Sequence, residues 1–213
     1  MPLQDSWQYK MKCYGATLRG SVSLWLLLVA GACFAQSGYG KQDTLSAADR
    51  LELQRVWVAF ATAIATNDVA AIKAISTPCV GCVDCLTNTA EEHKKIMEMC
   101  HQYPEKWYDM MYGKLCFIET GRFIRDDLPV VLNEETRARL LDESKLYFVD
   151  NGHNRGVYDN NCIASVAERK KAVFAEVLVT VIDSGGGSEG MQKAFAFVKT
   201  GSSFKFCGYS TIP

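Results

Sequence analysis

The chain has 213 residues, of which 48% are hydrophobic, and its formal charge is −1. This length is sufficient for one folded domain with a substantial core. The balanced charge lacks the basic excess of a nucleic-acid-binding protein, so we expect no nucleic-acid partner.

The first 35 residues have the pattern of a secretory signal peptide. Basic residues precede the short, largely apolar run 22–30, and small residues follow it. The run is shorter than the roughly 20 apolar residues that a transmembrane span needs. We therefore expect cleavage after Ala35, export to the periplasm or cell envelope, and no transmembrane span. The mature chain is mildly acidic.

Two alternatives for this leader stay open. Residues 30–33, Ala-Gly-Ala-Cys, resemble a loose lipobox, so a lipoprotein anchored at Cys33 is the alternative to simple secretion. Met11 is an alternative to Met1 as the true start. With cleavage after residue 35, residues 36–44 are expected to form a flexible polar lead, and 45–213 a single domain.

The front of this domain is predicted to be helical. Ser46 caps a long amphipathic helix that reaches about Thr66, and Asn67-Asp68 ends it and begins a short helix over 69–75. The cysteine-rich stretch TPCVGCVDC, 77–85, is predicted to be a loop.

The middle of the chain continues with helices. One begins at Thr89 and ends before Pro104, and Asn133 caps another over 134–144. The aromatic stretch 105–118 fits a helix or a strand.

The last fifty residues change to strand patterns. The stretches 171–183, 191–199 and 204–212 are predicted to form an antiparallel meander. In the final strand, alternation places Phe204 and Phe206 on one face, and Cys207 and Tyr209 on the other. Helices followed by a meander predict an α+β domain with the helices on one face of the sheet.

Two stretches carry a resemblance to a known group. VWVAFATAIATNDVAAIKAIST (56–77) and KAFAFVKTGSSFKFCGYSTIP (193–213) resemble the long helix, short helix and closing hairpin of NTF2-like (cystatin-like cone) exported bacterial proteins. The resemblance implies N-terminal helices on a curved antiparallel sheet that wraps a pocket. Some members use that pocket for catalysis, whereas others bind ligands or form homodimers through the sheet. No catalytic motif of the group matches this chain, so no catalytic residue is assigned.

Seven cysteines follow the expected cleavage site, and in an exported protein they are disulfide candidates: Cys79, Cys82, Cys85, Cys100, Cys116, Cys162 and Cys207. Their odd number permits at most three intramolecular bridges. A bridge from the loop at 77–85 to Cys100 or Cys116 would hold that loop against the domain, which would contribute roughly 2–4 kcal/mol.

The three closely spaced cysteines also fit other chemistry. A ferredoxin cluster or c-type haem is excluded by the missing fourth cysteine and the missing Cys-x-x-Cys-His. A zinc or copper site remains an alternative, with Cys79, Cys82, Cys85 and His101 as ligands and His93 or Cys100 as additions. A redox site is a further alternative, although a thioredoxin-like motif needs a helix directly behind it. We favour structural disulfides and predict no cofactor.

Other side chains are weaker candidates. His153, in DNGHNRG, is a candidate general base, with an exposed loop position as the alternative. Asp126 and Asp127 are expected to form a solvated turn. We expect core packing, rather than a pocket, for the aromatic set Trp107, Tyr108, Tyr112 and Phe117, with Met110 and Met111.

Together these patterns favour a non-enzymatic, exported, disulfide-braced domain that binds a small molecule or an envelope protein. One alternative is a pocket enzyme of the isomerase or hydrolase type, using His153 or a buried carboxylate. A second alternative is a cysteine-based metal or redox protein.

Overall fold

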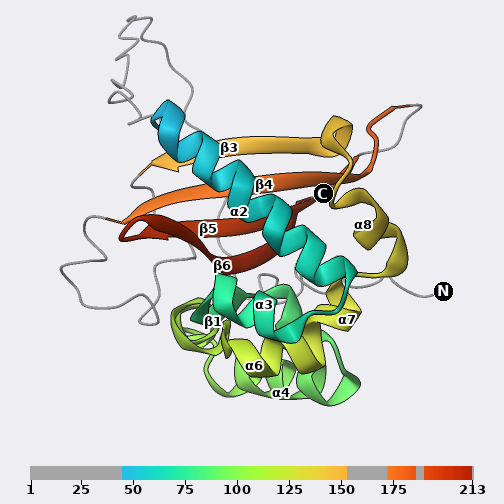
Figure 1. Ribbon diagram of the computed structural model, residues 1–213. Coiled ribbons are helices and arrows are strands. Elements are labelled where there is room, and N and C mark those ends of the chain that lie inside the picture. The colour runs from blue at the N-terminus through green and yellow to red at the C-terminus, as the bar shows by residue number, and fades with distance from the viewer. Residues whose placement is uncertain (1–44, 153–171, 186–189, 213) are drawn as a thin grey trace, which may run out of the picture.

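The computed structural model describes residues 45–152, 172–185 and 190–212. The predicted signal peptide and the lead 36–44 lie outside this range, as do Cys33, His153 and Cys162. The described residues confirm the predicted α+β class. Helices occupy the first part of the chain, and a six-stranded sheet with the order β2-β1-β6-β5-β4-β3 packs against them. The long helix α2 (Ala47–Ala65) lies diagonally across one face of this sheet (Figure 1).

The first two helices form as the sequence predicts. The Ser46 hydroxyl accepts from the Asp49 amide at 3.1 Å and caps α2, which ends at Ala65 with Thr66 as its C-cap. Asn67 has a left-handed φ of 53° and reverses the chain. The Asp68 carboxylate then caps α3 (Val69–Ile75).

The predicted loop at 77–85 is instead largely a strand, β1 (Ser76–Cys82). This strand pairs in parallel with β6 (Ser203–Ile212) and antiparallel with β2 (Phe117–Glu119), so the sheet is mixed. Pro78 is tolerated because it lies where the register against β6 shifts, and no regular ladder bond is needed there. The short 3₁₀ helix η2 (Asp84–Thr87) follows.

The middle of the chain consists of short helices. Thr89 and Glu92 form a capping box at the start of α4 (Ala90–Gln102). The predicted helix that begins at Thr89 is therefore confirmed. The ambiguous stretch 105–118 is helical first and joins a strand only at its end. The segments that complete this region are α5 (Trp107–Met110), the π-helical turn η3 (Met111–Leu115), α6 (Thr120–Arg122), the π-helical turn η4 (Phe123–Asp127), α7 (Leu128–Val131), α8 (Glu134–Arg139) and η5 (Glu143–Lys145).

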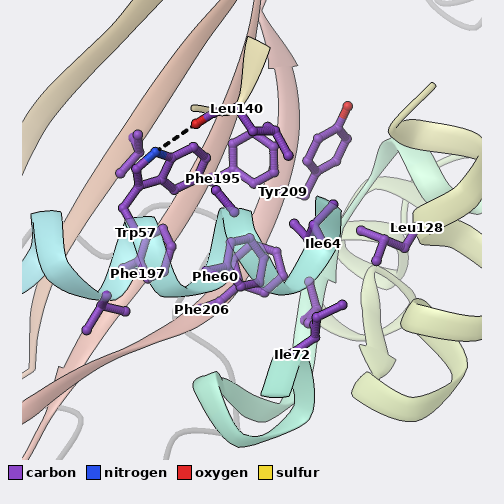
Figure 2. Packing of buried hydrophobic residues seen from close by; sticks show 14 of the residues in the cluster. Trp57, Phe60, Ile64, Ile72, Leu128, Leu140, Phe195, Phe197, Phe206 and Tyr209 are labelled. Carbon is purple, nitrogen blue, oxygen red and sulfur yellow. Dashed lines mark hydrogen bonds between the residues drawn. The ribbon is translucent and has the colours of Figure 1, made fainter. Parts of the chain in front are cut away.

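Helix α8 is capped by Asn133 as predicted but ends five residues early, at Arg139. The Leu140 carbonyl accepts from the Trp57 indole N–H at 3.1 Å instead of extending the helix (Figure 2). This bond ties the end of α8 to the middle of α2. Among the described residues, no helix is long and apolar enough to cross a membrane.

The predicted meander is confirmed. Its three predicted strands, β4 (Val173–Ile182), β5 (Met191–Thr200) and β6, pair antiparallel in sequence order. Strand β3 (Leu146–Gly152), which was not predicted, adds a fourth antiparallel strand beside β4. Gly201, with a φ of +64°, forms the tight turn between β5 and β6, where a left-handed residue is needed.

A β-bulge in β6 changes one predicted face. Ala196 pairs with Gly208 and Phe197 pairs with Phe206, so Cys207 is the extra residue. Tyr209 therefore returns to the helix-facing side with Phe206, and the prediction that it shares a face with Cys207 is wrong. Cys207 lies on the opposite side of the sheet, in a small buried cluster with Phe174 and Val198.

The main core fills the space between α2 and the sheet with aromatic rings. Phe60 lies 4.6 Å from Phe206, and Trp57 lies 5.1 Å from Phe195, measured between ring centroids (Figure 2). All four side chains are at most 1% exposed. The protein's own side chains therefore fill the middle of the helix-facing side of the sheet.

Candidate functional site

The register of the meander aligns its helix-facing residues in rows across four strands. One row is apolar apart from a tyrosine hydroxyl and contains Phe148, Val177, Phe195 and Tyr209. The next row, toward the end of the sheet, contains Leu146, Val179, Lys193 and Thr211. A lysine thus occupies a position where the strand pattern places apolar side chains.

Lys193 is half-buried and has few partners. Its Nζ donates to Thr211 Oγ1 at 2.9 Å and lies 5.8 Å from the centroid of the Tyr209 ring. Within the described ranges, no carboxylate forms an ion pair with it. Burial lowers the pKa of Lys193, and the charge of Asp84 partly offsets this effect. Lys193 is therefore a partly desolvated cation that has no direct counter-ion among the described residues.

Three further residues hold this position, and with Lys193 we call them the rim cluster: Asp84, Tyr209 and Thr211. Asp84 Oδ2 accepts from the Thr211 amide at 2.8 Å, which ties η2 to β6. The Tyr209 hydroxyl donates to the Val131 carbonyl at 3.2 Å, which ties β6 to α7. Burial raises the pKa of Tyr209, so its hydroxyl stays neutral. In Figure 2, Tyr209 lies at the edge of the ring cluster.

A disulfide encloses Asp84. Cys82 and Cys85 are bonded to each other, with a Cα–Cα distance of 5.4 Å, and both are 0% exposed. The Cys85 amide also donates to Cys82 Sγ at 3.2 Å. Cys79 is disulfide-bonded as well. The disulfide prediction is confirmed for Cys82 and Cys85, and while bonded neither can act as a thiolate ligand for a metal.

The remaining cysteines have different states. Cys116 and Cys207 are buried free thiols, so the expected bridge to Cys116 is wrong. The Cys116 thiol donates to the Tyr112 carbonyl at 3.2 Å, and burial raises its pKa to about 11. Cys100 and His101 lie on α4. In the part of the chain that the structure describes, no three His, Cys, Asp or Glu side chains gather as a metal site.

The acidic pair does not form a solvated turn. Asp126 is exposed and pairs with Arg125 at 2.8 Å, whereas Asp127 is only 2% exposed. The two diverge because they lie on a π-helical turn rather than on an extended chain. Asn88 Nδ2 donates to Asp127 Oδ1 at 2.9 Å, and Oδ2 has no hydrogen-bond partner within the described residues. Burial raises the pKa of Asp127.

The aromatic set around α5 is less buried than predicted. Tyr108 is 53% exposed, whereas Trp107, Tyr112 and Phe117 are half-buried. The rings of Tyr108 and Tyr112 stack with their centroids 4.4 Å apart. The prediction of core packing is therefore wrong for Tyr108, and Met111 is the buried member of the set.

A shallow groove of about 440 Å³ lies where β1 meets β2 and α6, and its lining includes Thr77, Glu119, Thr120 and Gly121. Its polar groups bind one another. Thr120 Oγ1 donates to the Thr77 carbonyl at 2.5 Å, and the Glu119 carboxylate accepts from the Gly121 amide at 2.8 Å.

The fold and the rim cluster define an α+β protein with an open mixed sheet and a partly desolvated lysine at one end of its helix-facing side. No known protein family, curated protein or solved structure matches this chain. The resemblance to NTF2-like proteins therefore stays a prediction.

Sequence reasoning missed Lys193, although a signal for it was present. In Lys193-Ala194-Phe195-Ala196-Phe197, strict alternation places Lys193 on the same face as Phe195 and Phe197. A lysine on the aromatic face of a strand indicates either the end of the core or a buried charge.

Proposed function

We propose that this protein is an exported, disulfide-braced domain that binds a small molecule without transforming it. The observation that carries the proposal is the rim cluster, where Lys193 lies half-buried beside a closely packed aromatic core. In the part of the chain that the structure describes, it has no direct counter-ion. A cation in such a place is poorly hydrated, and an anionic ligand can provide the charge interaction that the described residues do not supply.

The cysteines support the exported part of the proposal. Disulfides persist mainly in oxidising compartments, and Cys82–Cys85 is buried next to the rim cluster. Because the bridge closes around Asp84, it also fixes the carboxylate that anchors the Thr211 backbone. In this proposal the disulfide braces the binding site itself.

One observation favours a second candidate, a pocket enzyme. Asp127 is a buried carboxylate with a raised pKa, and groups of this kind act as general acids or bases. Its one hydrogen-bond partner within the described residues is the Asn88 amide, which cannot relay a proton at neutral pH. We therefore rank binding above catalysis.

Native mass spectrometry of the protein purified from exporting cells tests the proposal. A binding protein carries a small-molecule adduct that is released chemically unchanged when the protein unfolds. A purified protein that converts its released ligand into a product would contradict the proposal and support the enzyme. Retention of a second protein chain, with no small molecule, would instead support an envelope-protein partner.

A further inference from the structure

We propose that Lys193 is the anion-binding point of this protein and that its ligand is a small organic acid, held through a carboxylate. The inference rests on the proposed function and names the chemistry of the same site. The juxtaposition that carries it is a half-buried ammonium with a hydroxyl and a ring face as its described partners.

The hydrogen-bond count of Lys193 leaves room for a ligand. An ammonium has three N–H donors, and one of them is used by Thr211 Oγ1. The Tyr209 ring attracts the charge through its face without accepting a full hydrogen bond. Two donors are thus left for water or for the oxygens of a ligand.

Two other partly buried lysines have carboxylate partners. Lys199, near the far end of β5, forms an ion pair with Asp49. Lys145 forms an ion pair with Asp183 at 2.8 Å. Lys193 is partly buried like these two lysines but lacks a carboxylate partner within the described residues, which makes it the place where an external carboxylate can replace lost hydration.

The charges around Lys193 favour a monoanion. The titratable groups that face it are Asp84 from η2 and Tyr209 from β6. Asp84 is negative, so it repels a doubly charged phosphate more strongly than a singly charged carboxylate. Tyr209 stays neutral, and its hydroxyl already donates to Val131. One available cation therefore matches one carboxylate.

The neighbours favour an organic acid over an inorganic ion. Val179 is opposite Lys193 on β4, and the Tyr209 ring lies beneath the ammonium. Farther along the same end of the sheet, Ile182 pairs with Met191, which shares the face of Lys193, and is 44% exposed. A ligand with its carboxylate at Lys193 has apolar surface within reach for the rest of its structure.

Binding and protonation of Lys193 must be coupled. Because burial lowers the pKa of Lys193, a bound carboxylate that stabilises the ammonium raises that pKa. The coupling is reciprocal, so affinity for the acid falls as Lys193 loses its proton.

The test follows the side-chain ¹³Cε resonance of Lys193 by NMR in the folded protein. The probes are benzoate and octanoate, with benzyl alcohol, octanol and inorganic phosphate as comparisons. The carboxylates are expected to shift the Lys193 resonance and to raise its pKa, whereas the alcohols and phosphate have little effect. Lys193→Met should weaken carboxylate binding by about tenfold or more, the loss of one charge-assisted hydrogen bond. Lys193→Arg should retain part of it.

Lys199→Met is the matched control, since it removes a lysine from the same strand and should leave carboxylate binding intact. The proposal is overturned by unchanged carboxylate affinity in Lys193→Met or by an equal effect of phosphate. If Lys193→Met does not fold, the titration of the wild-type resonance still decides.

The failures of the two proposals are distinguishable. Carboxylate binding at Lys193 without any native small-molecule adduct would contradict the proposed function and support the site. A native adduct that lacks an acidic group would contradict the site and support the proposed function.

Discussion

Asp127 is a carboxylate that the fold buries, with Asn88 as its hydrogen-bond partner on one oxygen and none within the described residues on the other. Burial raises the pKa of Asp127 above the ordinary 3.8, so this carboxyl binds a proton more readily in the folded protein than in the unfolded chain. The stabilisation that comes with this raised pKa is complete below the pKa of Asp127 in the unfolded chain. It is lost as the pH rises through the pKa of Asp127 in the folded protein.

We therefore predict that Asp127→Asn raises the free energy of unfolding relative to wild type at neutral pH. The difference should shrink toward acid pH, as measured by urea denaturation between about pH 3 and pH 8. Asp126→Asn is the control: Arg125 lowers the pKa of that exposed carboxylate, so no gain is expected. A loss of stability in Asp127→Asn at every pH would show that the ionised carboxylate has a stabilising partner.

The two free thiols give a second prediction at this scale. Cys116 is 1% exposed, and Cys207 is 0% exposed. With a pKa of about 11, roughly one Cys116 in a thousand is a thiolate at pH 8. Neither cysteine should react with iodoacetamide in the native protein, and both should react after denaturation, as peptide mass spectrometry would show. Fast native alkylation of Cys116 would mean that the edge of the sheet at β2 opens readily.

At the scale of elements, the Cys82–Cys85 disulfide joins the end of β1 to η2. Because the closed loop is short, replacing both cysteines by alanine should cost only about 2 kcal/mol of unfolding free energy in the chain-entropy account. The measurement is urea denaturation followed by tryptophan fluorescence. In strong reductant the difference between the two proteins should nearly vanish. A difference that persists there would place the effect in side-chain packing rather than in the bond.

The elements that the sequence predicted are those with local causes. Ser46, Asp68, Thr89 and Asn133 each cap a helix through a bond to a residue three positions on. Strands β4, β5 and β6 pair with their neighbours in the chain, so alternation and turn residues were enough to find them, whereas β3 was not predicted.

The elements that were missed depend on distant residues. Strand β1 pairs with β6, more than 120 positions away, and its pattern of cysteines, glycine and proline gave no strand signal. The bulge at Cys207 and the inward turn of Asp127 are set by the packing around them. The rim cluster brings Asp84 from the front of the chain to Lys193 and Thr211 at its end, so only its lysine could be found from the sequence.

Across the whole molecule, rings from α2, β5 and β6 occupy the middle of the layer between helix and sheet. The NTF2-like resemblance implies a pocket on this side, but in the described residues the unmet hydrogen-bonding capacity of Lys193 lies at the end of the sheet. A ligand would thus bind at the rim, between the strand ends, η2 and α7. Disulfide bracing of η2 gives that rim a fixed shape.

The central claim, an exported domain braced by disulfides, is tested most directly by the intact mass of the protein recovered from exporting cells, measured with and without reductant. We predict a chain that begins at Gln36 and gains two hydrogens for each disulfide on reduction, including Cys82–Cys85. A lipid mass on Cys33 would support the lipoprotein alternative. A chain that keeps residues 1–35 and carries all its cysteines as free thiols would contradict the account.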